Sequence, residues 1–399
     1  MKLHSKFLAI LLIIITSCKG PSLNNEADKK FTEFFSNHKE LSASYLVMHD
    51  DNVLLHGAQG FFDREQNIKL SDNQQMPIAS GTKQMTAAMI MRLQERGILS
   101  VEDTIAKFLP EDSDWWIDAT MPDWADKVTI HQLLTHTSGI AEYIPALKFD
   151  MSLGHKKIKH LIATFAAQTP LTHEPGSKYS YSNTGYFFLG IIIESLTKQD
   201  IASIFKDEFF DPIGMADTRM ASFDEAVKFQ QDQLPNFPKR YFVVPTGAEP
   251  KYLPSKVDFF VVPFTDGGVI STVSDLVKWN KAFHNGDVVS EYSYKLMTTP
   301  YTEAHDLLVK NVKSGYGVYI HTLDDGRLVY YHEGRAVAIR SEHGYIPESD
   351  IYFAVLSNIM IYETPDMIGK VDYTNPANQF DIGFLRTVIW SLDSPKAKN

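Results

Sequence analysis

The stretch QMPIASGTKQMTAAMIMRLQERG (75–97) places a hydroxyl and an amine where they could exchange a proton. Ser80 follows two apolar residues, and Lys83 comes three residues later on the same face of a predicted helix. The helix is apolar nearly all round, which predicts that it is buried. Because burial lowers the pKa of a lysine, Lys83 could become a neutral amine that takes the proton of Ser80. A serine activated in this way is a nucleophile.

The Ser-x-x-Lys spacing is weak evidence when taken alone. It occurs four times, at Ser36–Lys39, Ser80–Lys83, Ser195–Lys198 and Ser203–Lys206. The other three pairs fall in amphipathic helices that are predicted to lie at the surface. Ser80 differs because it stands where a helix begins, so its backbone N–H can join the free donors of the first turn. The alternative is a solvated Lys83 without a catalytic role.

A second candidate segment is EPGSKYSYSNTGYFFLG (174–190), in which Tyr181-Ser182-Asn183 precedes an apolar helix. A tyrosine near a cationic lysine has its phenolate form favoured, so Tyr181 could act as a base and as an acid. Asn183 offers a donor and an acceptor to a substrate amide or ester. The alternative is an exposed turn that ends in an N-cap residue.

A third candidate segment is LVYYHEGRAVAIRS (328–341). His332 ends a strand-like run, and Gly334 permits close approach of the backbone to a ligand. The edge of such a strand can present a backbone N–H to a developing oxyanion, with the N–H of Ser80 as its partner. A metal site is not indicated, because His131 and His136 are five residues apart and point to different faces of a helix. No cofactor is implied.

The composition is that of a globular protein with one large domain or two medium ones. The chain has 399 residues, 44% of them hydrophobic and 22% charged, and its net charge is −11. That charge and the lack of a basic stripe argue against nucleic acid as a partner.

The N-terminus, MKLHSKFLAILLIIITSCKG, predicts a signal peptide with a lipid attachment site. Two lysines precede an apolar run (7–15) that is too short to cross a bilayer. The run ends in Ile15-Thr16-Ser17-Cys18, which resembles the cleavage box of bacterial lipoproteins, and Cys18 is the only cysteine. We therefore expect a lipid anchor at Cys18, a location in the bacterial cell envelope and no disulfides. An ordinary signal peptide with an incidental cysteine is the alternative.

Strand patterns lie near both ends of the sequence, and helical patterns lie between them. SASYLVMHDDNVLLHGAQGFFD (42–63) predicts two strands around a turn at Asp50-Asp51-Asn52, and strand patterns return after about residue 265. This arrangement predicts one sheet built from both ends of the chain, with a helical insertion. The expected division is a signal peptide (1–17), a flexible tether (18–30) and one folded domain (31–399), whose α/β part is about 31–105 and 265–399 and whose helical part is about 106–264.

Together, Ser80-Gly-Thr-Lys83, Tyr181-Ser-Asn183 and His332-Glu-Gly334 resemble the three ordered motifs of the serine β-lactamase and penicillin-binding-protein superfamily. The branch with class C β-lactamases, D,D-carboxypeptidases and β-lactamase-fold esterases is the most similar. Linking stretches add to the resemblance, which spans about residues 40–360: LLTHTSGI (133–140), DPIGMADT (211–218), GGVISTVSDLVKW (267–279) and SGYGVYI (314–320). The resemblance implies an α+β fold, with an antiparallel sheet flanked by helices, an all-helical subdomain and a site between them.

The resemblance also implies a role for each matched residue. Ser80 would be the acylated nucleophile, Lys83 its base or the support of that base, and Tyr181 a proton shuttle to the leaving group.

The remaining matched residues would bind the substrate. Asn183 would hold its acyl side chain and help orient Lys83, and His332 would hydrogen-bond toward Tyr181 and the leaving group. Gly334 would let the strand approach the substrate, and the N–H groups of Ser80 and Arg335 would form the oxyanion hole.

The chain departs from the family pattern in the third motif. Glu333 stands where the family often has glycine or threonine, and Arg335 replaces a small residue. A carboxylate there would repel the carboxylate that β-lactams and D-Ala-D-Ala peptides carry, although Arg335 and Arg340 could offset it. The departure lowers the expectation of a true β-lactamase and favours a neutral ester, amide or peptide as substrate.

The functional prediction is a serine hydrolase that cleaves an ester, amide or peptide bond through an acyl-enzyme. Its substrate would be a small molecule or a peptide, including peptidoglycan-derived peptides, and the protein would be a monomer. A ligand-sensing or penicillin-binding protein of the same fold without turnover is the alternative. The segment EDSDWWIDATMPDWADK (111–127) could stack on a sugar or cover the cleft, but ordinary packing of its tryptophans is the preferred interpretation.

Overall fold

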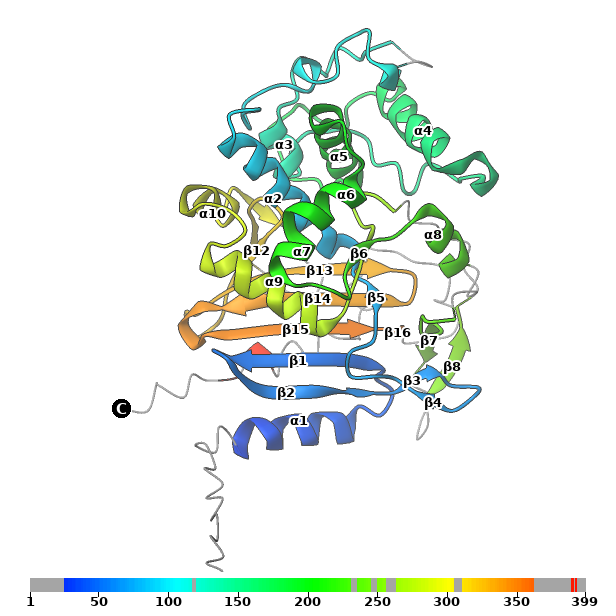
Figure 1. Cartoon of the computed structure of the whole chain (residues 1–399), viewed down its shortest axis with the longest axis vertical. Helices are drawn as coiled ribbons and strands as arrows, with labels where there is room; N and C mark the ends of the chain where they lie inside the picture. Colours follow the sequence, from blue (N-terminus) through cyan, green and yellow to red (C-terminus); the bar gives the residue numbers. More distant parts are fainter. Residues whose placement is uncertain are drawn as a thin grey trace, which may run out of the picture.

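The structure, a computed structural model, describes residues 25–116, 120–230, 235–244, 250–255, 263–304, 311–361, 389–390 and 392. It has an α+β fold in which helices cover an antiparallel sheet (Figure 1). The fold class predicted from the sequence is confirmed.

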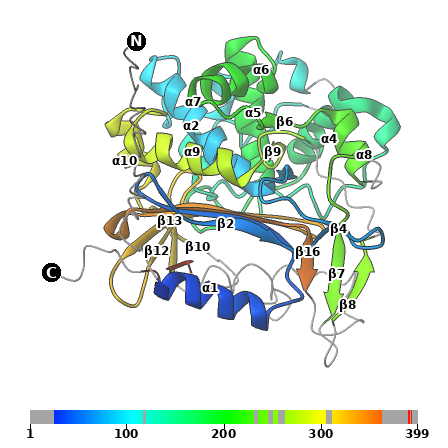
Figure 2. The same cartoon turned by 60° about the horizontal axis from the view of Figure 1, so that its bottom comes forward.

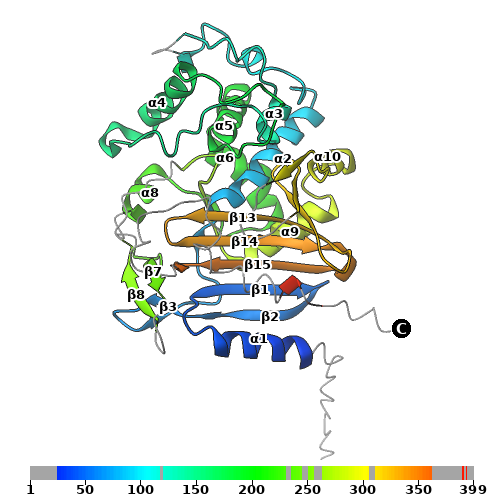
Figure 3. The same ribbon diagram turned by 180° about the vertical axis from the view of Figure 1, so that it is seen from behind.

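The main sheet has eight strands in the order β10-β11-β12-β13-β14-β15-β1-β2, and each neighbouring pair is antiparallel. The N-terminal hairpin pairs with a strand from the other end of the chain, as the sequence pattern predicts (Figure 3). The strands are β1 (Ala43–His49), β2 (Asn52–Gln59), β10 (Thr302–Ala304), β11 (Val312–Ser314), β12 (Tyr319–Thr322), β13 (Leu328–Ala336), β14 (Ile339–Ile346) and β15 (Ile351–Ser357).

The position of each strand follows from its side chains. Every residue of β15 is buried, which suits a strand inside the sheet with both of its faces covered. β2 has exposed residues and forms one edge of the sheet. The smaller strands are β3 (Phe61–Asp63), β4 (Ile68–Lys69), β5 (Met76–Pro77), β6 (Arg219–Met220), β7 (Tyr241–Val244), β8 (Lys251–Pro254), β9 (Val269–Ser271) and β16 (Ile359–Ile361).

Helices cover both faces of the sheet (Figure 2). α1 contributes Phe31 and Phe34 to a core on one face, where they lie in the same cluster as Phe353 of β15. α9 packs on the opposite face against β1, β14 and β15. The helices are α1 (Asn25–Asn37), α2 (Thr82–Glu95), α3 (Ile130–Leu134), α4 (Gly154–Gln168), α5 (Asn183–Thr197), α6 (Ile201–Phe205), α7 (Asp211–Ile213), α8 (Phe223–Gln230), α9 (Val273–Asn285) and α10 (Glu291–Met297).

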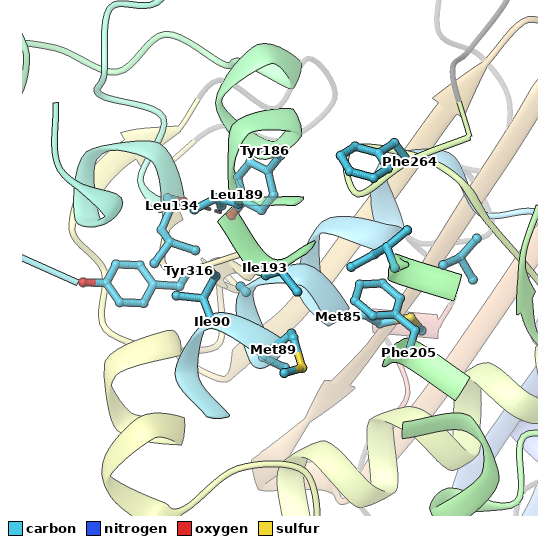
Figure 4. Packing of buried hydrophobic residues seen from close by; sticks show 14 of the residues in the cluster. Met85, Met89, Ile90, Leu134, Tyr186, Leu189, Ile193, Phe205, Phe264 and Tyr316 are labelled. Atoms are coloured by element: carbon cyan, nitrogen blue, oxygen red, sulfur yellow. Dashed lines mark hydrogen bonds between the residues drawn. The ribbon is translucent and has the colours of Figure 1, made fainter. Parts of the chain in front are cut away.

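The larger core is built around α2 and α5, which pack against each other. Figure 4 shows Met85, Met89 and Ile90 of α2 near side chains of α5, among them Leu189 and Ile193. Nearly all residues of α2 are buried, as its apolar sequence predicts. α2 therefore connects the region of the sheet with the helical region (Figure 1).

The tryptophan-rich segment packs into this core. Trp116 and Trp124 are only 3% and 6% exposed, and both lie against Phe188 of α5. Trp115 stacks on His160 of α4. The preferred interpretation, ordinary packing, holds for these three tryptophans.

The N-terminal boundary needs one correction. α1 begins at Asn25, so residues 25–30, which we expected in a flexible tether, are helical. Cys18 and the predicted signal peptide lie outside the described residues. Of the helices that the structure describes, none combines the length and the apolar character that a membrane span requires.

Candidate active site

Ser80 lies in a short 3-10 helix, η1 (Ala79–Gly81), which leads directly into α2. The backbone before it is in an unusual conformation, because Ala79 has a φ of 46° without being a glycine. The N–H of Ile78 donates to the carbonyl of Val269 in β9, which anchors the turn. The segment therefore fixes Ser80 at the N-terminal end of α2 and leaves it partly exposed.

Lys83 is completely buried beside Ser80. Its Nζ donates to the Oγ of Ser80 at 3.1 Å, to the Oδ1 of Asn183 at 2.7 Å and to the backbone carbonyl of Asp266 at 2.5 Å. All three acceptors are oxygens of uncharged groups. The sequence-predicted amine and hydroxyl are thus in hydrogen-bond contact.

Burial lowers the pKa of Lys83 to about 8, although the nearby carboxylates of Asp266 and Glu142 oppose that shift. About half of the Lys83 side chains are consequently neutral near pH 8. A neutral amine at 3.1 Å can accept the proton of the Ser80 hydroxyl.

Asn183 is the first residue of α5, and Ser182 is the N-cap of that helix. The Ser182 hydroxyl accepts a hydrogen bond from the N–H of Gly185 at 2.9 Å. The alternative interpretation is therefore right that this segment supplies an N-cap, but wrong that the turn is exposed, because Ser182 is buried. The N-cap does not exclude chemistry, because the same cap directs Asn183 toward Lys83.

Tyr181 joins the group through both its ring and its hydroxyl. The Nζ of Lys83 lies 5.0 Å from the centroid of the Tyr181 ring. Burial raises the pKa of Tyr181 well above 10, and a hydrogen bond with Ser80 offsets only part of that rise. The expectation of a favoured phenolate is wrong, because desolvation outweighs the neighbouring charge. Tyr181 is a protonated phenol that can donate.

His136 packs against Tyr181, a role that the sequence did not reveal. Its ring stacks on that of Tyr181 with centroids 4.4 Å apart. Its Nδ1 accepts from the N–H of Ser182 at 3.1 Å, and its carbonyl accepts from the N–H of Ser180 at 2.8 Å. Burial and the charge of Lys83 hold the pKa of His136 well below 6.5, so the ring is neutral.

The third motif lies on β13, which packs against η1. His332 is buried, donates from Nδ1 to the carbonyl of Glu333 at 2.6 Å and stacks on Tyr319. The Arg335 guanidinium donates to the Glu333 carboxylate at 2.7 Å, so the two charges form an ion pair on one face of the strand. The carboxylate of Glu333 raises the pKa of Tyr181, which indicates that this pair lies near the site.

Gly334 is required by packing within the chain itself. A Cβ atom there would lie 1.9 Å from the carbonyl oxygen of Ile78 and 2.4 Å from the Oγ of Ser341. The close approach that this glycine permits is therefore between β13 and the segment before Ser80.

Two carboxylates complete the site, the half-buried Glu142 and the buried Asp266, and sequence reasoning missed both of them. Glu142 accepts from the N–H of Asn183 at 2.6 Å, and Asp266 accepts from the hydroxyl of Tyr143 at 2.7 Å. The only signals were their positions beside recognised stretches, since Glu142 follows LLTHTSGI by two residues and Asp266 precedes GGVISTVSDLVKW. Within the described part of the chain, no group of His, Cys, Asp or Glu side chains could hold a metal ion.

Comparisons with known proteins agree with this geometry. A family model described as Beta-lactamase matches residues 27–370. Penicillin-binding protein 4* of Bacillus subtilis (strain 168) is 26% identical over 304 residues, which are 74% of this chain and 63% of the relative. Protein flp of Staphylococcus aureus (strain MW2) is 30% identical over 177 residues, or 44% of this chain and 34% of the relative. The chain thus spans less than two thirds of the length of either relative.

Solved structures share the fold. D-amino acid amidase from Ochrobactrum anthropi SV3 complexed with D-phenylalanine superposes with a TM-score of 0.72 at 18% identity, over 92% of this chain and 99% of that one. The octameric penicillin-binding protein homologue from Pyrococcus abyssi gives 0.66 at 24% identity, over 83% and 72%. Because the family model covers most of the sequence, the chain belongs to the Beta-lactamase family.

Proposed function

We propose that this protein is a serine hydrolase that cleaves an amide, peptide or ester bond through an acyl-enzyme. The observation that carries the proposal is the contact of the fully buried Lys83 amine with the Ser80 hydroxyl at 3.1 Å. Family membership and the fold of the D-amino acid amidase support the same class of reaction.

In the proposed first step, neutral Lys83 takes the proton of Ser80 while Oγ attacks the substrate carbonyl carbon. The electron pair of the carbonyl moves onto its oxygen, where the N–H groups of Ser80 and Arg335 would stabilise the negative charge. When the intermediate collapses, Tyr181 donates its phenol proton to the leaving group and regains a proton from Lys83. Water then releases the acyl group by the reverse sequence.

The Glu333–Arg335 ion pair supports a particular class of substrate. Both side chains are mostly buried, with 16% and 15% of their surface exposed, and together they bring no net charge to the edge of β13. A neutral pair offers little attraction to a substrate carboxylate. We therefore favour substrates that are uncharged at this edge, such as amino acid amides and simple esters, over β-lactams.

The direct test compares the wild type with Ser80→Ala on chromogenic esters, D-amino acid amides, carboxylate-bearing D-amino acid peptides and a penicillin. We expect turnover of the uncharged substrates by the wild type and no turnover by the variant, which should still fold. Mass spectrometry after treatment with a fluorophosphonate should show an adduct on Ser80. Retained hydrolysis by Ser80→Ala would refute the assignment.

The same experiment identifies the alternative, a ligand sensor without turnover. An adduct that forms once and is never released, with no hydrolysis of any substrate in the panel, would favour the sensor. Rapid hydrolysis of the penicillin would instead show a true β-lactamase and contradict the role given to Glu333.

We also propose, from the sequence alone, that Cys18 is lipidated and anchors the protein in the cell envelope. Metabolic labelling with a fatty acid should modify the wild type and not Cys18→Ser. Equal labelling of both proteins would refute the anchor.

A further inference from the structure

Glu142 occupies a position between the helix α5 and the catalytic lysine. One carboxylate oxygen, Oε2, accepts from the backbone N–H groups of Asn183 and Thr184 at 2.6 and 3.5 Å. The other, Oε1, accepts from the N–H of Ile144 at 3.2 Å and from the Nδ2 of Asn183 at 3.3 Å. The carboxylate therefore faces four donors and satisfies the first turn of α5.

We propose that Glu142 is a positioning residue for catalysis: it fixes the orientation of the Asn183 amide and, through it, the position of the Lys83 amine against Ser80. The proposal rests on the function proposed above. It assigns to Glu142 a role that neither the three motifs nor the family membership provides.

The two ends of the Asn183 amide face different partners. A carboxylate can only accept hydrogen bonds, so the end of the amide that faces Glu142 must be the donor, Nδ2. The other end, Oδ1, is then left to accept from the Nζ of Lys83 at 2.7 Å. If the amide turned over, it would present Nδ2 to Lys83 and an oxygen to the carboxylate; the oxygen contact would always be repulsive, and the Nδ2 contact would be repulsive whenever Lys83 is protonated. Glu142 thus excludes the wrong orientation.

Glu142 also contributes to the charge around Lys83. The titratable groups near the amine are Ser80 on η1, Tyr181 before α5, Tyr186 on α5, His136 after α3, and the carboxylates of Glu142 and Asp266. Only the two carboxylates carry negative charge, and both favour the protonated amine. Burial raises the pKa of both carboxyl groups, which means that each is costly to keep ionised.

The two carboxylates differ in how they are held. Glu142 is stabilised by donors on both oxygens, whereas the Oδ1 of Asp266 has no hydrogen-bond partner among the described residues. The four donors favour the ionised form of Glu142. Glu142 is therefore the acidic group that is best placed to hold Asn183.

Glu142→Gln tests the proposal because the replacement has the same shape but one oxygen becomes an NH₂ group. Both oxygen positions face donors, so either orientation of the glutamine places N–H against N–H. We expect kcat/KM for an ester substrate to fall on the order of 10²-fold, the loss typical of a misplaced catalytic group. The acid limb of the pH profile reflects the deprotonation of Lys83. Removal of the Glu142 charge should lower the pKa of Lys83 and so move this limb to lower pH.

Glu142→Asp is the conservative variant, since it keeps the charge and retracts the carboxylate by one methylene. We expect it to leave the acid limb where it is in the wild type, and to retain more activity than Glu142→Gln but less than the wild type, because the retracted carboxylate holds Asn183 less well.

Glu194→Gln is the matched control. Glu194 also lies on α5 and accepts from a backbone N–H, that of Ile201 at 3.1 Å, and from a buried lysine, Lys159, at 2.5 Å, but it lies outside the site. Loss of the Glu194 carboxylate should lower the thermal stability of the protein without changing its kcat/KM or its pH profile.

Wild-type kcat/KM in Glu142→Gln would overturn the proposal, as would a loss of activity without any shift of the acid limb. If Glu142→Gln does not fold, Glu142→Asp decides, and wild-type kcat/KM in that variant would overturn the proposal. A failure of the proposed function itself is recognised separately, because the wild type would then form no Ser80 adduct with a fluorophosphonate.

Discussion

Two buried lysines of this protein, Lys83 and Lys159, differ in what they contact. Lys159 is 7% exposed, donates to the Glu194 carboxylate at 2.5 Å and lies 3.9 Å from the centroid of the Phe264 ring. Lys83 is fully buried and donates to three oxygens of uncharged groups. Burial lowers the pKa of both amines, but only Lys159 has a carboxylate in direct contact that opposes the shift.

The difference shows how a fold separates a structural charge from a reactive one. A carboxylate in contact with a buried lysine favours the ammonium form, and removal of either partner leaves the other charge buried and uncompensated. A lysine that is desolvated and held only by neutral acceptors can lose its proton near physiological pH. The nearby carboxylates of Asp266 and Glu142 keep the pKa of Lys83 at about 8 rather than lower.

The largest effect is expected from changes at Lys83. Lys83→Met removes the base, and Lys83→Arg leaves a guanidinium that cannot be deprotonated. We expect each variant to lower kcat/KM for an ester by about 10³–10⁴-fold, at the upper end of the range for general-base catalysis. Circular dichroism should show that both variants are folded. Activity within tenfold of the wild type in Lys83→Arg would show that the amine does not accept a proton.

Tyr181→Phe should have the next largest effect and sharpen the assignment of the base to Lys83. The ring can still stack on His136, but no phenol proton reaches the leaving group. We expect a loss on the order of 10²-fold in kcat/KM, typical of one proton-transfer group. The acid limb should stay at the pH of the wild type, because Tyr181 is protonated throughout that range. A displaced limb would assign the base to Tyr181.

Lys159→Met should affect stability instead of catalysis. It leaves the mostly buried Glu194 carboxylate without its lysine, which should lower the free energy of unfolding by about 3 kcal/mol. Urea denaturation measures this loss, and kcat/KM of the folded fraction should be unchanged. A stable but inactive Lys159→Met protein would contradict the conclusion that Lys159 serves stability and Lys83 serves catalysis.

Lys159→Arg should have the smallest effect, since the guanidinium keeps the charge and can still contact Glu194. We expect a change of about 1 kcal/mol or less in the free energy of unfolding, as for an ordinary substitution. Full activity of Lys159→Arg together with an inactive Lys83→Arg would show most clearly that Lys83 is reactive and Lys159 is structural. If both arginine variants were inactive, this distinction between the two lysines would be wrong.

The sequence predicts which helix and which strands carry the site better than it predicts the environment of each side chain. The apolar pattern of α2 predicts that Lys83 is buried, and the strand patterns at both ends predict the single sheet. The phenolate at Tyr181 was wrongly expected because the degree of burial depends on segments far away in the sequence, including the one with His136.

Glu142 and Asp266 could not be predicted for a related reason. Each acts on Lys83 only because the fold brings its segment to α2 and α5, and neither residue has a distinctive local pattern. The start of α1 at Asn25 was missed because the polar residues before Phe31 carry no apolar periodicity.

The most direct test of the account is the rate at which a fluorophosphonate acylates Ser80 between pH 6 and pH 10. Because Lys83 must be neutral to accept the Ser80 proton, the rate should rise with pH and level off above a midpoint at about 8. A rate that does not change over this range would contradict the central claim that Lys83 is the base.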